Sequence, residues 1–317
     1  DVLRLRIAEE GQRQAEILRE NTATLDDCLD RIRNRRRSLW ERMESHSDFL
    51  TMRLGVGELP MQAEFRFPES RFTVEEDPLQ AELEAFCREP RNIPDVPITL
   101  PLKEACISGV VGPKERLLPF LKGLVLQLAA LHGYDEVKLA FFLSEEEEAD
   151  WDFARWLPHT WDAEKTALAG HLEKIFQARG EEEGRREKIR TWYVLVVPDP
   201  AVLPRLEIAR RILEAPECRG FVLLCAAGEL RLLPRECRLV ADLTAAEGRL
   251  FQPESIDGEG TAFQPDISFE GSGRELAVSL ANTALDTGSG RKRLPDMVPF
   301  LKMFGVGKIE HLNALDR

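Results

Sequence analysis

The sequence predicts an α/β fold: a mostly parallel sheet with flanking helices, preceded by a helical stalk and a small β-hairpin element. Three observations support this class. From about residue 98 onward, short apolar runs typical of buried strands alternate with amphipathic helical segments. The first 44 residues carry apolar side chains at three- and four-residue spacings, as helices do. Between these regions, residues 49–54 are a short β-rich run and residues 62–67 alternate apolar and polar side chains as a half-buried strand does.

The composition indicates a globular protein of one large domain or two modest ones. The chain has 317 residues, of which 43% are hydrophobic, and its net charge is -13. This acidic balance disfavours a broad phosphate-binding surface, so we expect no nucleic acid partner. No apolar run approaches the roughly 20 residues that span a bilayer, so we expect this segment itself to be soluble. Because the chain opens without Met inside a helical pattern, we expect it to be part of a longer protein.

The cysteines indicate free thiols. The six lie far apart without a CxxC pair: Cys28, Cys87, Cys106, Cys218, Cys225 and Cys237. Several lie inside apolar runs, where a free thiol packs as a small hydrophobic group. We therefore expect a reducing cytosol, no zinc site and no other metal site.

Residues 1–48 are predicted to form the helical stalk. Asn21 and Thr22 interrupt the helical pattern, which predicts two antiparallel helices with Thr24 as N-cap of the second. The second helix carries a basic cluster, Arg31, Arg33, Arg35, Arg36 and Arg37. Such a cluster suits contact with anionic lipid or RNA, and it equally suits a solvated face paired with nearby acids. The residues alone leave these alternatives open.

Residues 49–97 are predicted to form a connector made of a β-hairpin and a helix. Gly55 and Gly57 are expected to turn the chain between a β-rich run and the alternating segment "QAEFRF" (62–67). An amphipathic helix is expected over 77–89. The proline-punctuated segment "NIPDVPITLPL" that follows is expected to be an extended approach to the main sheet.

The α/β domain is predicted over residues 98–310, with the start of a linker at 311–317. It opens with a strand, a helix and a strand, the arrangement that joins parallel strands. Residues 253–273 are expected to be a surface loop, because their apolar content is low. The expected strands are 106–111, 136–143, 191–200, 218–227, 236–243 and, as the last, 247–252; the expected helices are 117–131, 164–188, 204–216, one from 274 and a closing one over 297–304.

The turn "GVVGPKER" (109–116) lies where a phosphate-binding loop would lie. A working loop, GxxxxGK[ST], surrounds phosphate with backbone N–H groups, neutralises it with Lys and holds magnesium with Ser or Thr. Here Gly109 and Gly112 are present, but Pro113 has no N–H. Lys114 follows Gly109 too closely, and Glu115 adds negative charge at the helix end. The sequence therefore predicts a degenerate nucleotide site.

The second half of such a site is altered in "YVLVVPDP" (193–200). Asp199 is near the place of a magnesium-associated carboxylate, but Pro200 replaces the glutamate that would orient water. We therefore expect no catalytic residue and no cofactor in this segment. Three alternatives stay open. The first is a tight βα turn in which Asp199 caps the next helix, and the second is a site that binds nucleotide weakly without hydrolysing it. The third is a non-standard, hydrolysing site for ATP and Mg in which Lys114 and Asp199 are indispensable.

Two other stretches are candidates for function. The segment "RWLPHTWD" places His159 between Trp156 and Trp161, which suits either a protein-binding surface or a packed loop. The run "SEEEEADWD" (144–152) is expected to be solvated, because adjacent carboxylates point in different directions. No GxSxG motif is present, so the sequence contains no nucleophile elbow.

Three stretches of the chain resemble a known family. They are "RRSLWERMESHSDFLTMRLGVGELP", "GVVGPKERLLPFLKGLVLQLAALHGYDEVKLAFFL" and "DWDFARWLPHTW". They are similar to the membrane-anchored FtsK/SpoIIIE-type motor proteins of type VII secretion, especially the EssC form of Gram-positive bacteria. The likeness runs across nearly the whole chain, and the elements "LWERxxxxxDFLxxRLGxG" and "WLPHTW" are specific.

The resemblance implies a P-loop-NTPase-like (RecA/FtsK-like) fold in a degenerate first ATPase-like module. Residues 1–48 would be a membrane-proximal stalk whose arginine cluster lies near the anionic inner leaflet. The module would couple and assemble the motor as a pseudo-ATPase, linking membrane helices to downstream ATPase modules of the same chain. Membrane components of the secretion complex would be partners, the full-length protein would form a hexamer, and the segment would lie at the cytoplasmic face of the membrane. The surface around Trp156, His159 and Trp161 would dock a protein of the apparatus.

Overall fold

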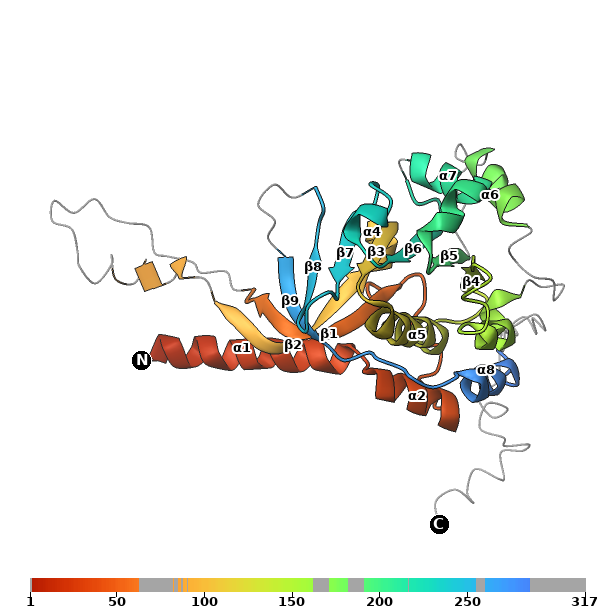
Figure 1. Cartoon of the computed structure of the whole chain (residues 1–317). Coiled ribbons are helices and arrows are strands. Elements are labelled where there is room, and N and C mark those ends of the chain that lie inside the picture. The colour runs from red at the N-terminus through yellow and green to blue at the C-terminus, as the bar shows by residue number, and fades with distance from the viewer. Residues whose placement is uncertain are drawn as a thin grey trace, which may run out of the picture. The chain divides into compact units, whose positions relative to one another are not determined.

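The described part of the chain folds around one nine-stranded sheet with the strand order β2-β1-β9-β8-β7-β3-β6-β5-β4 (Figure 1). This computed structural model describes residues 2–62, 82, 85, 86, 88, 89, 91–161, 171–181, 191–215, 217–254 and 260–285. The strands are β1 (Thr51–Pro60), β2 (Asn92–Pro101), β3 (Ile107–Val111), β4 (Val137–Phe141), β5 (Trp192–Val197), β6 (Phe221–Ala227), β7 (Leu239–Asp242), β8 (Gly248–Phe251) and β9 (Gly260–Pro265).

The parallel part of the sheet confirms the predicted α/β class. Strands β7, β3, β6, β5 and β4 are parallel neighbours. Their sequences are continuous apolar runs because helices cover both faces; every residue of β5 and of β6 is buried. Because these five strands run parallel to one another, their carboxyl ends meet at one edge of the sheet.

The other part of the sheet is antiparallel, and here the predicted hairpin is wrong. Gly55 and Gly57 lie inside β1, which pairs with β2 on one side and β9 on the other. A Cβ atom on Gly55 would lie 2.1 Å from the backbone oxygen of Gln264, and one on Gly57 would lie 2.3 Å from that of Ala262. Glycine is therefore needed for close approach of β9. Strand β9 itself lies in the segment expected to be a loop.

Helices cover both faces of the parallel part (Figure 1). On one face, α5 (Lys114–Leu131) packs against α2 (Leu25–Asn34), and α2 contacts α8 (Arg274–Ala281). The other face carries α6 (Leu172–Glu181) and α7 (Glu207–Glu214), whose buried side chains join a second core cluster. Smaller helices are α4 (Leu102–Ala105) and the 3₁₀ turns η1 (Asp152–Trp156), η2 (Pro158–Thr160), η5 (Pro200–Arg205) and η6 (Leu230–Leu232).

The two N-terminal helices do not form the predicted antiparallel pair. Helix α1 (Val2–Asn21) lies along β2, whereas α2 packs on α5 and its buried side chains join the main core. The helix break and the cap are as predicted: Thr24 Oγ1 accepts from the Asp27 N–H (3.1 Å), and Asp27 accepts from the Thr24 N–H (2.9 Å). The separation of the helices follows from packing, because each finds a different part of the sheet to cover.

The structure divides the chain differently from the predicted domains. Residues 1–283 form one unit, since β1 and β2 complete the same sheet as the predicted domain 98–310 and α2 lies in its core. Residues 284–317 form the second unit. The predicted strand at 62–67, most of the predicted helix at 77–89 and the closing helix at 297–304 lie outside the described residues. No helix in the described part of the chain is both long and apolar enough to cross a membrane.

The cysteine pattern needs one correction. Cys106 and Cys218 form a disulfide, with their Cα atoms 5.3 Å apart, although they are 112 residues apart in sequence. They come together because β3 and β6 are neighbours and each cysteine precedes its strand. The other described cysteines, Cys28, Cys225 and Cys237, are buried thiols as predicted, and burial raises the pKa of Cys28 and Cys237 to about 12.

Candidate functional site

The turn between β3 and α5 is too short to surround a phosphate. Strand β3 ends at Val111 and α5 begins at Lys114, so Gly112 and Pro113 alone connect them. The Gly112 N–H donates to the Ala227 carbonyl oxygen (3.1 Å), which extends the pairing of β3 with β6. Pro113 is the N-cap and has no N–H to offer. The two backbone groups that a phosphate would use first are thus committed or missing.

Both glycines of the turn are explained by packing. A Cβ atom on Gly109 would lie 2.3 Å from Leu233 Cδ1, and one on Gly112 would lie 3.0 Å from Leu243 Cβ. Neither has a positive φ, so neither needs the conformational freedom of glycine. Their presence is therefore no sign of a phosphate site.

A pocket of about 260 Å³ lies at the carboxyl ends of the parallel strands, beside this turn. Residues that follow four different strands line it, which is where ligands bind in open α/β sheets. Its polar lining is mostly acidic. The lining residues are Gly112, Lys114, Leu117, Leu118, Leu121, Ser144, Glu146, Glu147, Asp150, Trp151, Pro198, Asp199, Pro200, Ala227, Gly228 and Leu232.

The pocket gathers three of the five predicted site residues. Gly112, Lys114 and Asp199 line it, whereas Gly109 lies within β3 and Glu115 is exposed in the first turn of α5 without lining it. The sequence prediction missed the carboxylates that follow β4, because it treated the whole acidic run as solvated. The signal that could have found them is their position directly after a buried strand.

The charged groups of the pocket are already engaged with one another. Lys114 Nζ lies 3.4 Å from Asp150 Oδ2. Asp199 Oδ1 accepts from the Ala201 N–H (2.9 Å) and so caps η5, one of the alternatives that the sequence left open. Glu147 Oε2 accepts from both the N–H and the hydroxyl of Ser144 (3.1 Å each). Burial raises the pKa of Glu147, and the nearby charge of Asp199 adds to the shift.

The charges that line this pocket oppose the binding of a nucleotide phosphate. Four carboxylates line it, those of Glu146, Glu147, Asp150 and Asp199, against the single ammonium of Lys114. A polyphosphate placed there would meet like charges at short range, and one lysine cannot offset four carboxylates. In the described part of the chain, no group of three or more His, Cys, Asp or Glu side chains has the geometry to hold a metal ion.

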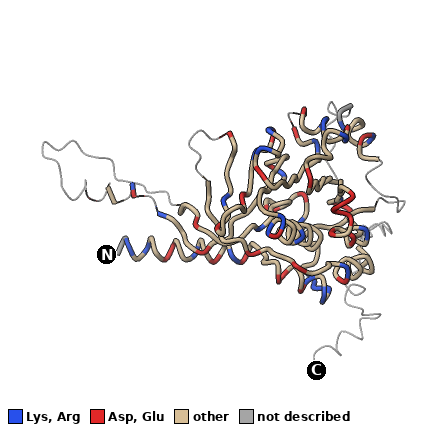
Figure 2. Tube along the Cα trace, in the orientation of Figure 1, with Lys and Arg blue, Asp and Glu red and all other residues tan. Residues whose placement is uncertain are grey.

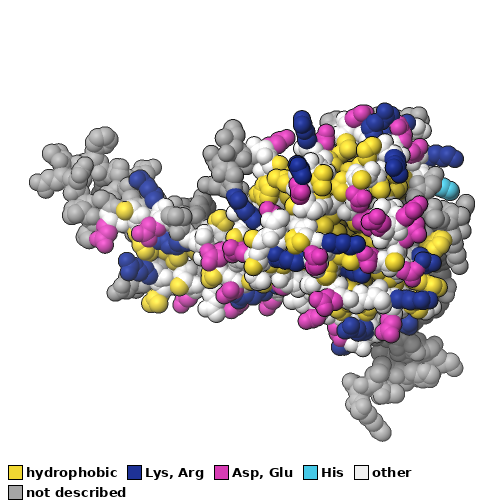
Figure 3. Space-filling model, viewed as in Figure 1, with side chains coloured by type: hydrophobic (Ala, Val, Ile, Leu, Met, Phe, Trp, Pro, Cys, Tyr) yellow, Lys and Arg dark blue, Asp and Glu magenta, His cyan; other side chains and the backbone are white. Residues whose placement is uncertain are grey.

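The predicted basic cluster lies in a part of the chain where Lys and Arg are close in sequence to Asp and Glu (Figure 2), and ion pairs engage some of its members. Arg31 is half-buried and pairs with Glu41, and Arg36 Nε lies 2.8 Å from Asp30 Oδ2. Arg36 is nevertheless exposed, as are the remaining members Arg33, Arg35 and Arg37. Across the face shown in Figure 3, Lys and Arg are interspersed with Asp and Glu. Only part of the cluster is thus directed at solvent.

The predicted aromatic surface is also divided. His159 is fully buried, and its Nε2 donates to the His132 carbonyl oxygen (2.9 Å). His132 Nε2 in turn accepts from the Leu50 N–H (3.0 Å). Burial lowers the pKa of His132 to about 3 and that of His159 to about 4, so both are neutral. Trp156 and Trp161 remain part-exposed, so any partner would meet the tryptophans and not the histidine.

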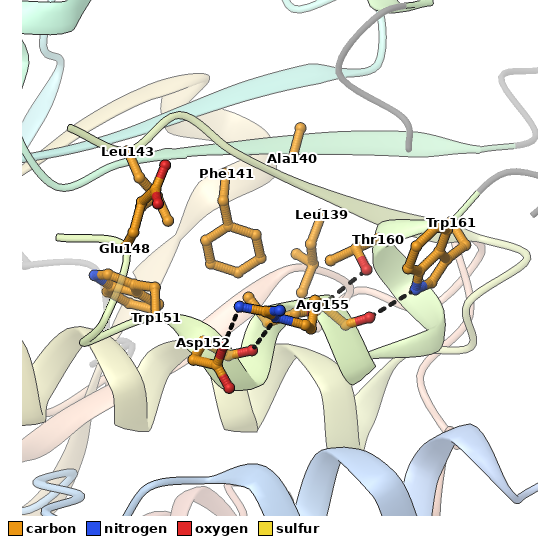
Figure 4. Close-up of a pocket in the computed structure, with 11 residues that line it drawn as sticks. Leu139, Ala140, Phe141, Leu143, Glu148, Trp151, Asp152, Arg155, Thr160 and Trp161 are labelled. Atoms are coloured by element: carbon orange, nitrogen blue, oxygen red, sulfur yellow. Dashed lines mark hydrogen bonds and ion pairs between the residues drawn. The ribbon is translucent and has the colours of Figure 1, made fainter. Parts of the chain in front are cut away.

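A second pocket, of about 390 Å³, lies under β4 beside the turn that carries these tryptophans (Figure 4). Figure 4 shows Leu139 and Phe141 pointing into it from β4, with Ala140 pointing to the other face of the sheet. Trp161 lies at one end and Trp151 at the other. Trp161 is fixed there, since its Nε1 donates to the Arg155 carbonyl oxygen (2.9 Å). The sequence indicated the tryptophans but not the cavity between them.

Comparison with known proteins identifies relatives of the chain. No protein-family model matches it. It is 21% identical over 324 aligned positions to the type VII secretion system protein EssC of Staphylococcus aureus, a match that covers 93% of the chain. It is 26% identical to the ESX-4 secretion system protein EccC4 of Mycobacterium tuberculosis (71% of the chain) and 26% identical to the ESX secretion system protein EccC of Thermomonospora curvata (55% of the chain).

A solved structure supports the fold. The cytoplasmic domain of the type VII secretion ATPase EccC of Thermomonospora curvata matches with a TM-score of 0.51 at 16% identity, covering 83% of this chain and 35% of that one. The curated matches cover only 21%, 19% and 13% of the length of EssC, EccC4 and EccC. The resemblance seen in the sequence is confirmed: the chain is a homologue of the EccC/EssC-type motor proteins of type VII secretion.

Proposed function

We propose that the α/β unit of this chain is a non-catalytic coupling and assembly module, a pseudo-ATPase, within a type VII secretion motor. The observation that carries the proposal is the pocket beside the β3–α5 turn. It occupies the place of a nucleotide site, but four carboxylates line it. Its one cation, Lys114, lies 3.4 Å from one of them.

The same pocket lacks what phosphoryl transfer requires. That reaction depends on positioned N–H groups and cations around the transferring phosphoryl group, and on a residue that orients water. The Gly112 N–H is bonded to Ala227, Pro113 has no N–H, and Pro200 follows Asp199 where the water-orienting glutamate would lie. Asp199 itself caps η5. Each of these missing groups would otherwise make a separate contribution to stabilising the transition state.

The proposed role is mechanical. The sheet joins β1, close to the N-terminal helices, to the parallel strands, so the unit can pass a displacement between elements on either side of it. We place it between membrane components of the secretion complex and downstream ATPase modules of the same chain, at the cytoplasmic face of the membrane. A hexamer of the full-length protein belongs to the same proposal. The names of the relatives support the link to type VII secretion, and the solved structure that matches the fold is of a cytoplasmic domain of a secretion ATPase.

The test is calorimetric titration of the 317-residue chain with ATP and magnesium, followed by phosphate release from the same sample. We expect neither binding heat nor release. The Lys114→Ala and Asp199→Ala variants should therefore equal the unchanged chain and a control, Lys122→Ala, which alters the same helix away from the pocket.

The alternative function is an ATP- and Mg-binding module with a non-standard site, and one observation favours it: Lys114 and Asp199 do line the same pocket. Saturable ATP binding that is lost in Lys114→Ala and Asp199→Ala, but kept in Lys122→Ala, would replace the proposal with this alternative. Binding without phosphate release would keep the module non-catalytic and assign it a structural or sensing nucleotide.

A further inference from the structure

The pocket beside the β3–α5 turn carries negative charge that its own lining does not neutralise. Among the described residues that line it, four are carboxylates and one, Lys114, is a cation. Lys114 Nζ lies 3.4 Å from Asp150 Oδ2 and its side chain is 68% exposed, so it offsets one carboxylate from the rim. Burial raises the pKa of Glu147, and the charge of Asp199 adds to the shift. An entering cation would relieve this repulsion.

The basic side chains next to the lining residues are engaged elsewhere or outnumbered. Arg116 of α5 donates from Nη1 to the Leu243 carbonyl oxygen (2.7 Å). Arg231 of η6 pairs with Glu229. Arg205 is exposed at the end of η5 and does not line the pocket. Two further exposed carboxylates on the loop after β4 outnumber it: Glu145 and Glu148. The charge around the pocket is therefore negative as well.

Trp151 gives a second, independent feature of the same pocket. Its side chain is 1% exposed, and among the described residues its Nε1 has no hydrogen-bond acceptor. The residue lines both pockets. Figure 4 shows the nitrogen turned away from Phe141 and from the larger pocket, toward the carboxyl end of β4, where the pocket beside the turn lies. A buried N–H group without an acceptor is costly, so the pocket has a place for an acceptor atom of a ligand.

The arrangement of the carboxylates suits an organic cation better than a metal ion. Glu146, Glu147 and Asp150 follow β4, whereas Asp199 follows β5, so the carboxylates come from two loops. Within the described ranges, no three such groups are placed to hold a metal. The guanidinium group of arginine is planar and spreads five N–H donors, so it can bond carboxylates that lie apart. An ammonium group is a more compact charge.

Two exposed apolar side chains at the rim indicate that the cation belongs to a protein. Leu230 is 48% exposed and Leu232 is 55% exposed, and Leu232 lines the pocket together with Pro200 of η5. A small polyamine would leave these leucines uncovered, and it has no acceptor for the Trp151 N–H. A peptide segment has carbonyl oxygens beside its basic side chain, and its apolar side chains can cover the leucines.

We infer that this pocket receives an arginine side chain from a segment of a partner protein. The guanidinium group lies among the carboxylates, and a main-chain carbonyl oxygen of the segment accepts from Trp151 Nε1. An apolar neighbour of the arginine covers Leu230 and Leu232. The inference rests on the proposed function, because a pocket that holds ATP is not free for this side chain. It gives the assembly role of the module a defined contact surface.

The test is an NMR titration of the 317-residue chain, labelled with ¹⁵N at its tryptophan indoles, with a capped tripeptide of leucine, arginine and leucine. Comparison with the Trp151→Phe variant identifies the Trp151 signal. A twin peptide has citrulline in place of arginine, which keeps the shape of the side chain and removes its charge. We expect the Trp151 signal to shift saturably with the arginine peptide, and the citrulline peptide to bind about tenfold more weakly or worse.

Two protein variants separate the pocket from general electrostatic attraction. Glu145 and Glu146 are adjacent exposed carboxylates on the loop after β4, and of the two only Glu146 lines the pocket. The variants Glu146→Gln and Glu145→Gln remove the same charge, so attraction by net charge alone would weaken equally in both. We expect Glu146→Gln to lower the affinity for the arginine peptide about threefold and Glu145→Gln to leave it unchanged.

Four results would each overturn the inference: equal affinity of the two peptides, equal affinity of the two variants, a Trp151 signal that does not move, or no saturable binding. None of these results bears on phosphate release. That reaction is measured on the chain without peptide, and it tests the proposed function separately.

Discussion

Arg53 on β1 and Asp266, directly after β9, form a two-pronged ion pair between residues 213 positions apart. Arg53 Nε lies 2.9 Å from Asp266 Oδ2, and Nη2 lies 2.5 Å from the same oxygen. The arginine side chain is 8% exposed and the aspartate 31%. The pair links β1 to the residue that follows β9, next to the register in which the two strands pair.

Removing one partner should therefore cost more than removing a surface pair. We expect Asp266→Asn to lower the free energy of unfolding by about 3 kcal/mol, because it leaves the Arg53 charge buried without its partner. Urea denaturation measures the change. The control is Glu229→Gln, which breaks the exposed pair with Arg231 and should cost less than about 1 kcal/mol. Equal costs would show that the buried pair is not a special contact.

The close approach of β1 and β9 gives a second prediction. Gly55→Ala should lower the free energy of unfolding by about 1 to 3 kcal/mol, because the new methyl group meets the Gln264 backbone and forces the strands apart. Gly228→Ala is the matched control, since a Cβ there meets nothing within 4 Å, and it should stay within about 0.5 kcal/mol of the parent. A harmless Gly55→Ala would contradict the pairing of β1 with β9.

The buried histidines predict a loss of stability in mild acid. Burial holds the folded pKa of His132 at about 3 and that of His159 at about 4, below the ordinary value of 6.5. Below pH 6.5 the unfolded chain binds protons that the folded chain does not, so stability falls as pH falls from 6.5 toward 4. At pH 5 each histidine should account for about 2 kcal/mol of lost stability.

Urea denaturation at pH 7 and pH 5 measures this loss. The variant His159→Gln keeps an N–H donor for the His132 carbonyl group but cannot be protonated. Its pH dependence between the two values should be smaller than that of the parent by about 2 kcal/mol. An unchanged pH dependence would show that His159 is charged, or exposed, in the folded protein.

The disulfide can be tested by counting the free thiols of the chain. The chain has six cysteines, and alkylation in denaturant should add two fewer labels without reductant than with it. Because Cys106 and Cys218 close a long loop, reduction should lower the free energy of unfolding by about 4 kcal/mol. The variant Cys218→Ser should show the same loss without reductant. Equal labelling under both conditions would leave the original expectation of free thiols in place.

The exposed arginines at the carboxyl end of α2 give a prediction for lipid binding. Arg33, Arg35 and Arg37 should each contribute about 1 kcal/mol to association with phosphatidylserine-containing vesicles. The affinity of the triple alanine variant for these vesicles, measured by co-sedimentation, should therefore be about a hundredfold lower than that of the unchanged chain. The matched control is Arg31→Ala with Arg36→Ala, whose side chains are engaged with Glu41 and Asp30. Equal losses in both variants would exclude a specific lipid-facing surface.

Local sequence was enough for the parallel core and for the helix cap at Thr24. Strands β5 and β6 are continuous apolar runs, a pattern that helices on both faces require. Strand β9 was missed because "GTAFQP" has little apolar content and becomes a strand only by pairing with β1. Gly55 and Gly57, which permit this pairing, were predicted to lie in a turn, because the sequence alone does not show that the backbone of β9 approaches them.

The sequence predicted which phosphate-binding groups the candidate site lacks, but it did not predict the negative charge of the pocket. Pro113 and Pro200 indicate damage to a phosphate site from residue type alone. The carboxylates of Glu147 and Asp150 face the pocket only because the loop after β4 folds back beside α5, which is a tertiary relationship. The burial of His159 likewise depends on the distant His132 carbonyl group.

The sheet order has a consequence for synthesis on the ribosome. Strand β1 is made early, but its second neighbour, β9, follows only after all the parallel strands have been translated. Until then one side of β1 is an open edge, able to pair with another nascent chain. The antiparallel part of the sheet is complete only when the last strand has been made. A chaperone or rapid translation would therefore protect this protein from aggregation more than it would protect a protein whose strands pair in chain order.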